Sequence, residues 1–214
     1  MSAYILEFTL ESDAIFARGD GVSGLVDIEV QHDQWGFPFL GGRTLKGLLA
    51  EECADILAAL GEESGRWEHT AARLFGVPGE QESILSVGDA TLPEDLRQLV
   101  ARQIENGELT PTQVLESLTA IRRQTSMEVT GVPKAHTLRS MRVILRRTKF
   151  QAPLFFTEAP TEDDLSLLSV CIKALRRAGS RRNRGFGRLK SRLLCDGKDV
   201  TQVWAERFYQ EVGV

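Results

Sequence analysis

Apolar residues recur with two different periods along the chain, and each period predicts a type of element. Over residues 4–10 every second side chain is apolar, which is typical of a strand with one buried face. Apolar residues three or four positions apart predict helices elsewhere. We expect strands at residues 4–10, 84–87, 138–145, 153–157 and 188–194, and a short extended piece at 25–30. We expect helices at residues 44–60, 64–75, 93–107, 111–123, 161–179 and 200–212.

Polar residues and a glycine predict where several of these helices begin and end. Thr44 and Thr110 are of a type favoured at the N-cap, where a side-chain oxygen accepts a free backbone N–H. Thr161, followed three positions later by Asp164, forms an approximate capping box. Gly61 follows the first predicted helix as the glycine that closes its last turn.

The irregular alternation of strands and helices favours an α+β fold of the ferredoxin-like type with insertions. The two helices over residues 93–123 stand between strand-like segments, so we expect them to form a helical insertion. Residues 124–136 have no strong period and are expected to form a loop or a hairpin. At 214 residues and 42% hydrophobic content, the chain has the size and composition of one large globular domain.

The cysteines and the N-terminal residues predict a protein of the cytoplasm. The three cysteines are far apart and have no CxxC spacing, so we expect buried thiols and neither a disulfide framework nor a zinc cluster. The first residues lack the basic and apolar regions of a signal peptide. No run approaches the roughly 20 apolar residues of a membrane helix, so we expect no membrane association.

Charge is strongly segregated along the chain. Residues 1–121 hold 7 Lys and Arg against 21 Asp and Glu, whereas residues 122–192 hold 17 against 5. The net charge of −4 therefore hides one acidic and one basic part. A protein of this kind often binds a polyanion with one face.

The densest basic stretch runs from Leu165 to Cys195, where nine basic residues occur without one acidic residue. Within it, Gly185 and Gly187 allow a backbone turn and a close approach of a ligand to their N–H groups. These features indicate a phosphate-binding loop. A solvated basic hairpin is the alternative.

Three further segments could carry chemistry. Arg43 and Lys46 lie in the first turn of a predicted helix behind a glycine pair, an arrangement suited to an anion or to simple exposure. Asp27 follows a glycine-rich loop and could hold Mg²⁺ or orient a hydroxyl, although a solvated aspartate fits equally. Residues 122–149 hold eight Lys and Arg and an apolar edge that includes Met127, which suits a loop wedged between bases or a solvated hairpin.

The order of these motifs resembles that of the RAMP superfamily of CRISPR effector complexes, especially the backbone subunits of type III complexes. The matching segments are GLVD (24–27), GFPFLGGRTLKG (36–47), VGDATL (87–92), VTGVPKAHTLRSMRVI (129–144) and SRRNRGFGR (180–188). The resemblance implies a single RAMP domain over residues 1–214, with an RRM-like palm, an insertion at about 93–123 and a β-hairpin thumb at about 124–139.

The resemblance also implies a function. Such a chain binds guide crRNA, meets target RNA, and assembles with other RAMP subunits and with the large and small subunits of the complex. Asp27 matches the aspartate that cuts target RNA with Mg²⁺ or another divalent metal, so it is the expected catalytic and metal-binding residue. The expected RNA-binding residues are Arg43, Lys46, Arg122, Arg123, Met127, Lys134, His136, Arg139, Arg181, Arg182, Arg184, Gly185, Gly187 and Lys190.

Two alternatives stay open within the same superfamily. The GGRTLKG segment is also similar to that of subunits that bind the 5′ handle of the guide and do not cut RNA. A third hypothesis is a guide-processing endoribonuclease that uses His32.

Overall fold

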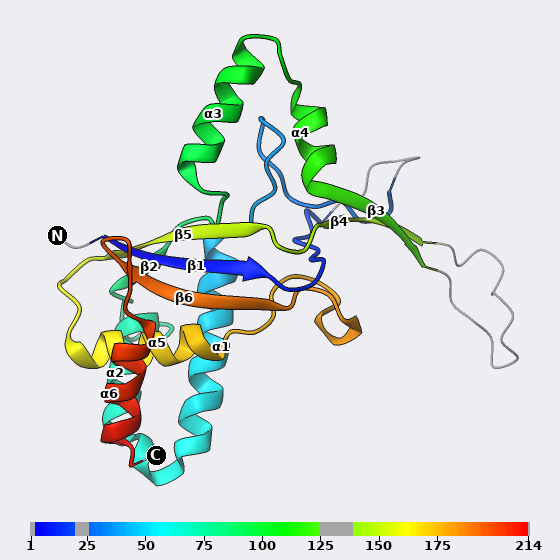
Figure 1. The fold of residues 1–214 in the computed structure, drawn as a ribbon. Helices are drawn as coiled ribbons and strands as arrows, with labels where there is room; N and C mark the ends of the chain where they lie inside the picture. The colour runs from blue at the N-terminus through cyan, green and yellow to red at the C-terminus, as the bar shows by residue number, and fades with distance from the viewer. Residues whose placement is uncertain (1–2, 20–25, 125–138, 214) are drawn as a thin grey trace, which may run out of the picture.

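A five-stranded antiparallel sheet forms the centre of the molecule, with the strand order β2-β5-β1-β6-β7 (Figure 1). The structure, a computed structural model, describes residues 3–19, 26–124 and 139–213. The strands of this sheet are β1 (Tyr4–Leu10), β2 (Leu85–Val87), β5 (Lys149–Phe156), β6 (Leu189–Cys195) and β7 (Lys198–Asp199). The central strand β1 alternates as its sequence predicts, because Leu6, Phe8 and Leu10 are buried in the core.

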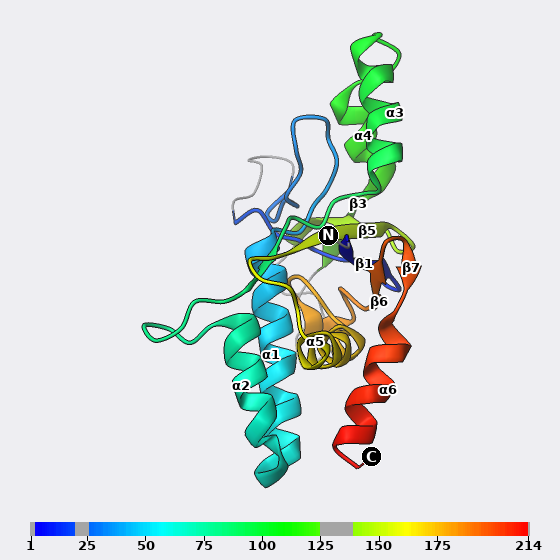
Figure 2. The same cartoon turned by 90° about the vertical axis from the view of Figure 1, so that its left-hand side faces the viewer.

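Four helices cover one face of this sheet (Figures 1 and 2). They are α1 (Gly42–Leu60), α2 (Gly65–Phe75), α5 (Glu162–Ala174) and α6 (Thr201–Glu211), and a 3₁₀ turn (Gly61–Ser64) joins the first two. Phe8 of β1 stacks on Phe150 of β5 at the centre of the core, with ring centroids 5.2 Å apart. This mixed arrangement of sheet and helices confirms the predicted α+β class.

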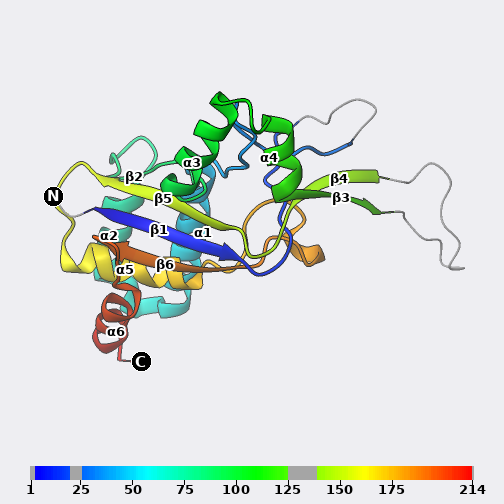
Figure 3. The same cartoon turned by 45° about the horizontal axis from the view of Figure 1, so that its top comes forward.

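Two further units project from the sheet. The helices α3 (Glu94–Glu105) and α4 (Pro111–Leu118) form a helical hairpin that rises on the side away from α5 (Figure 2). The strands β3 (Thr119–Gln124) and β4 (Arg139–Ile144) form a separate antiparallel ribbon that extends from one end of the molecule (Figure 3). The thumb predicted at about 124–139 lies almost entirely outside the described residues.

The prediction of a helix over residues 111–123 is wrong at its end, because the last five of these residues belong to β3. The helix stops at Leu118, and the hydroxyl of Thr119 donates to the backbone oxygen of Leu115. From there the chain pairs with β4, beginning with Thr119 opposite Ile144. Backbone pairing with a strand 20 positions further on overrides the local helical spacing.

Two other observed element boundaries differ from the predicted ones. The fifth helix ends at Ala174 and not at Gly179, because the following residues turn and pair with the start of β6, where Arg177 bridges Arg188. β5 begins at Lys149, four residues before the predicted start at Pro153, since Lys149 already pairs with Thr9.

Three predicted helix ends are confirmed, and one is wrong. Thr110 and Thr161 each form a capping box, and Gly61 is the C-cap of α1 with φ +59°. Thr44 is not an N-cap, because α1 begins two residues earlier with Gly41 as its N-cap. The cap comes from a distant residue instead: the N–H of Gly42 donates to Oδ1 of Asp89 at 2.8 Å.

All three cysteines are free thiols; Cys53 and Cys171 are buried, and Cys195 is partly exposed. Within the described residues, no helix is both long enough and apolar enough to cross a membrane.

Candidate RNA-binding surface

Segments that are far apart in the sequence meet at one end of the molecule, which we call the basic end. It comprises residues 13–17, residues 26–30, the β3-β4 ribbon and the loop 176–188, which we call the basic loop. Ile15, Met141 and Val143 form a small buried cluster there, against which Ile28 and Phe186 pack. Figures 1 and 3 show the ribbon and the basic loop side by side at this end. The fold thus brings together three of the segments whose residues suggest RNA binding.

Asp27 is exposed and lies beside the start of β4, at the end of the β3-β4 ribbon that is farther from α4. Its N–H donates to the backbone oxygen of Ser140 at 2.9 Å. Its Oδ2 accepts the N–H of Ser140 at 2.6 Å and the Ser140 hydroxyl at 3.3 Å. The segment 26–30 therefore runs beside β4, and its Ile28 forms a parallel bridge with Met141. The predicted extended piece is confirmed for residues 26–30, where single bridges alternate along the chain.

A buried ion pair, which the sequence does not predict, lies two residues along from Asp27. Oε1 of Glu29 accepts Nε of Arg142 at 2.9 Å, and both side chains are almost fully buried. Arg142 also donates to the hydroxyl of Thr119 at 3.2 Å. If the segment 26–30 shifted along β4, the two side chains would separate and each would become a buried charge without a partner. The ion pair therefore fixes the register of this segment on β4. The residues are 113 positions apart, and no sequence pattern links them.

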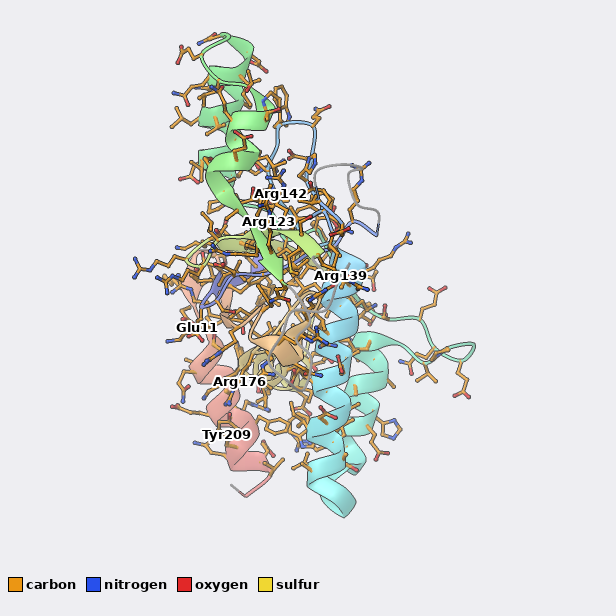
Figure 4. All side chains as sticks on the ribbon, turned by 90° about the vertical axis from the view of Figure 1, so that its right-hand side faces the viewer. Glu11, Arg123, Arg139, Arg142, Arg176 and Tyr209 are labelled. Atoms are coloured by element: carbon orange, nitrogen blue, oxygen red, sulfur yellow. The ribbon has the colours of Figure 1, made fainter. Side chains whose placement is uncertain are left out.

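Exposed arginines lie at the same end of the ribbon as Asp27. Arg123 stands opposite Ser140 and Arg139 stands opposite Gln124, and both arginines are exposed. Residues opposite each other on paired strands share a face, so Arg123 lies on the face that carries the Ser140 side chain. Figure 4 looks onto this end and shows Arg123 and Arg139 on the ribbon, with Arg176 on the segment below it.

Asp13 holds the ribbon and the basic loop together, and the sequence does not predict this role either. Its Oδ2 accepts Nε and Nη2 of Arg122 at 3.1 and 2.9 Å. Its Oδ1 accepts the N–H of Arg146 at 3.2 Å, and its backbone oxygen accepts the N–H of Gly187 at 2.8 Å. Arg122 is therefore paired within the protein, although it stays half exposed.

The basic loop is tightly packed at Gly187 and open at Gly185. Gly187 has φ +74°, and a Cβ there would meet the backbone oxygen of Ala178 at 1.9 Å. Gly185 has φ +85°, but a Cβ there would meet nothing within 4 Å. Arg181 adopts the left-handed conformation with φ +58° and donates to the side-chain oxygen of Gln124 at 2.8 Å. Gly187 serves backbone packing, whereas Gly185 leaves room for a ligand.

The arginines of the basic loop differ in whether they are already paired with a protein side chain. Arg182 forms an ion pair with Glu51 of α1 at 3.2 Å. Arg184 is exposed and has no side-chain hydrogen bond or ion pair with any residue that the structure describes. A hollow of about 890 Å³ lies between this loop and α1, and its walls include Arg176, Arg184 and Glu52. The pKa of Glu52 is raised, first by burial and then by the neighbouring Asp55 and Glu51.

The remaining predicted residues are not all part of the basic end. Arg43 is exposed in the first turn of α1, whereas Lys46 donates to the hydroxyl of Ser83. Burial lowers the pKa of Lys46 below its ordinary value. Lys190 stands opposite Thr9 on the face of the sheet that α5 does not cover. Met127, Lys134 and His136 lie outside the described residues.

Asp27 could offer one carboxylate ligand to a divalent metal ion. Among the residues that the structure describes, no three His, Cys, Asp or Glu side chains are grouped as metal ligands. Mg²⁺ is often held by one or two carboxylates, with water and substrate phosphates completing its shell. The exposed carboxylate of Asp27, whose hydrogen bonds with Ser140 use Oδ2, suits that kind of site. His32, the residue of the third hypothesis, has its Nδ1 3.1 Å from the backbone oxygen of Asp33.

A family model identifies one family, and solved structures show chains of similar fold. A family model described as "RAMP superfamily" matches residues 7–190. A solved structure described as "Cryo-EM structure of the Type III-B Cmr-beta bound to cognate target RNA" contains a chain of similar fold, with a TM-score of 0.63 and 13% identity. The similarity covers 89% of this chain and 96% of that chain.

The structure described as "Type III-B Cmr-beta Cryo-EM structure of the Apo state" matches with a TM-score of 0.60 and 14% identity. The similarity covers 90% of this chain and 97% of that chain. No curated protein matches the chain in sequence.

Proposed function

Because the chain belongs to the RAMP superfamily, we propose that it is a guide-RNA-binding backbone subunit of a type III CRISPR effector complex that cleaves target RNA at Asp27. The fold similarity to chains of the type III-B Cmr-beta structures, one of which holds target RNA, supports the assembly and the ligand class.

One observation supports this proposal most directly. Asp27, exposed and hydrogen-bonded to Ser140, lies at the same end of the ribbon as Gln124, which contacts Arg181 of the basic loop. An acidic group that does chemistry on RNA needs cations nearby, because the phosphates of the strand would otherwise repel it. Arg123 and Arg139 supply that charge on the same ribbon.

The geometry of the basic end suggests how the chain's own residues act. Arg184 and Arg176 hold the phosphates of the guide, and Arg123 and Arg139 hold those of the target at the ribbon. The Asp27 carboxylate accepts the proton of a target 2′-hydroxyl. The 2′-oxygen bonds to the adjacent phosphorus and the bond from phosphorus to the 5′-oxygen breaks. The leaving oxygen takes a proton from water, which gives a 2′,3′-cyclic phosphate and a 5′-hydroxyl. The hydrogen bonds from Ser140 fix the orientation of the Asp27 carboxylate toward the 2′-hydroxyl.

A divalent cation, when bound, would supply positive charge to neutralise the scissile phosphate. Asp27 would hold it together with a phosphate of the RNA.

The substitution Asp27→Asn in the assembled complex tests the proposal. It keeps a side-chain oxygen that accepts from Ser140 but removes the base. We expect target cleavage to fall between about 10²- and 10⁴-fold while target binding is unchanged. Asp95→Asn, a change of another exposed aspartate on α3, serves as the matched control and should cut normally. Cleavage of target RNA by the Asp27→Asn complex at the normal rate would refute the catalytic role.

The alternative is a RAMP subunit that holds the 5′ handle of the guide as a scaffold. It is favoured by the hydrogen bonds between Asp27 and Ser140, which also suit a purely structural link between the segment 26–30 and β4. A scaffold at the handle predicts one copy in each complex, whereas a backbone subunit predicts several. Native mass spectrometry of the assembled complex separates the two.

A further inference from the structure

The central sheet has a second face, which the helices α1, α2, α5 and α6 leave uncovered (Figure 3). We call it the open sheet face. Cross-strand pairing arranges its side chains in rows, which follow one another from the basic end along the strands. The rows are Lys149, Thr9 and Lys190, then Gln151, Glu7 and Arg192, then Pro153, Ile5 and Leu194, and Phe155 stands beyond them on β5.

The second row is a closed ionic network. Oε1 of Glu7 accepts Nε of Arg192 and its Oε2 accepts the side-chain N–H of Gln151, both at 2.8 Å. Burial by itself raises the pKa of Glu7, but the hydrogen bonds from Gln151 and Arg192 and the charges of Arg192 and Lys149 lower it overall. Glu7 is therefore an ionised carboxylate that neutralises Arg192, and this row offers little net charge to a ligand.

The first row is different, because it contains a cation that no described neighbour neutralises. Lys190 is exposed, and among the described residues no side chain forms a hydrogen bond or an ion pair with it. Nζ of Lys149 lies 3.8 Å from Glu7, at the limit of an ion pair. A groove of about 460 Å³ lies at this row, with Lys149 and Lys190 in its walls together with Lys173 of α5 and the acids Glu7 and Asp199. Glu7 lies near Lys149, so Lys190 is the lysine of this row that is left to attract a phosphate.

The far end of the open sheet face presents an aromatic ring. Phe155 is 59% exposed, although large aromatic side chains are normally buried. Within the described part of the chain, no other ring contacts it, whereas its neighbour Phe156 packs against Tyr4 at 5.5 Å. A flat ring that stands free on a sheet is a platform on which a base can stack.

We propose that the open sheet face binds single-stranded RNA, with a phosphate held by Lys190 and Lys149 and a base stacked on Phe155. Phe155 follows Lys149 by six positions on β5, a distance of about 20 Å along an extended strand. The cationic row borders the basic end, since β1 runs into residues 11–13 and β6 follows the basic loop. A strand of RNA that leaves the basic end can continue across this face. The site adds to the proposed guide-binding function, but it consists of different residues and can fail independently.

The test uses the full chain and a short fluorescein-labelled oligouridylate. We expect Phe155→Ala to weaken binding by about fivefold or more, because a base stacked on an aromatic ring contributes at least about 1 kcal/mol. Leu99→Ala on α3 is the matched control, since Leu99 is 58% exposed and Phe155 is 59% exposed.

Lys190→Ala should reduce the slope of log affinity against log salt by about 0.7, the contribution of one phosphate contact on a single strand. Lys198→Ala, a change of an exposed lysine opposite Cys195 and thus on the other face of the sheet, should leave the slope unchanged.

Arg184→Ala, measured in parallel, reports on RNA binding at the basic end. Weaker binding by Arg184→Ala together with normal binding by Phe155→Ala and Lys190→Ala would overturn the open-face site and leave the guide-binding proposal intact. Phe155 would then be a contact for another protein subunit.

Discussion

At the scale of single residues, Gly185 and Gly187 of the basic loop have different roles, although they stand only two positions apart in the sequence. Both have positive φ. Only at Gly187 does the neighbouring backbone fill the space where a Cβ would lie, and its N–H already donates to Asp13. Only Gly185 combines its turn with open space beside it. The prediction that both contact RNA stays a prediction, but the structure favours Gly185 as the point of close approach.

This difference predicts unequal effects on stability. We expect Gly187→Ala to destabilise the fold by about 2 kcal/mol or more, because left-handed strain and a clash with Ala178 add together. Gly185→Ala should cost about 1 kcal/mol, the strain alone. Free energies of unfolding in urea measure both effects. Equal destabilisation of the two variants would show that the close packing at Gly187 is relaxed in solution.

At the scale of elements, the sequence predicts which helices and strands exist better than it predicts where they end. The N-cap predicted at Thr110 and the capping box predicted at Thr161 are local, since cap and partner are three residues apart, and both are confirmed. The start of α1 depends on Asp89, which is 47 residues from Gly42. No local pattern contains that hydrogen bond, so Thr44 is the best N-cap that the sequence offers.

The cap at α1 can be tested by comparing Asp89 with Thr44. Asp89→Ala should destabilise the protein by about 0.5–2 kcal/mol, the usual effect of removing a capping side chain. Thr44→Ala should change stability by less than about 0.5 kcal/mol, since Thr44 is exposed inside the helix. Thermal and urea unfolding of both variants provide the measurement. A larger destabilisation in Thr44→Ala than in Asp89→Ala would contradict the assignment of the cap.

At the scale of the whole molecule, the sequence predicts that basic segments gather but not how their charges are paired. Charge counts and motif order are enough to single out Asp27 and the basic loop. The contacts of Asp27 with Ser140 and of Arg181 with Gln124 join residues 113 and 57 positions apart. Such contacts follow from the packing of the ribbon on residues 13–17 and 26–30.

The ion pairs within the basic loop indicate how much each of its arginines should contribute to RNA binding. Replacing Arg181, Arg182 and Arg184 together with alanine should lower the salt slope by up to roughly 2, which is about 0.7 for each phosphate that is no longer bound. Arg184→Ala alone should account for one whole phosphate, because Arg184 has no ion pair among the described residues, whereas Arg182 is shared with Glu51. Fluorescence anisotropy at several salt concentrations measures the slope. An unchanged slope in the triple variant would mean that the loop is only solvated.

The hydrogen bonds of Asp13 have a mechanical consequence. Three oxygen atoms of Asp13 accept these hydrogen bonds. They connect the ribbon, the turn after β4 and the basic loop to the segment 13–17. A tilt of the ribbon must either break these hydrogen bonds or carry the basic loop with it. A force on the ribbon is therefore transmitted to the basic loop through Asp13.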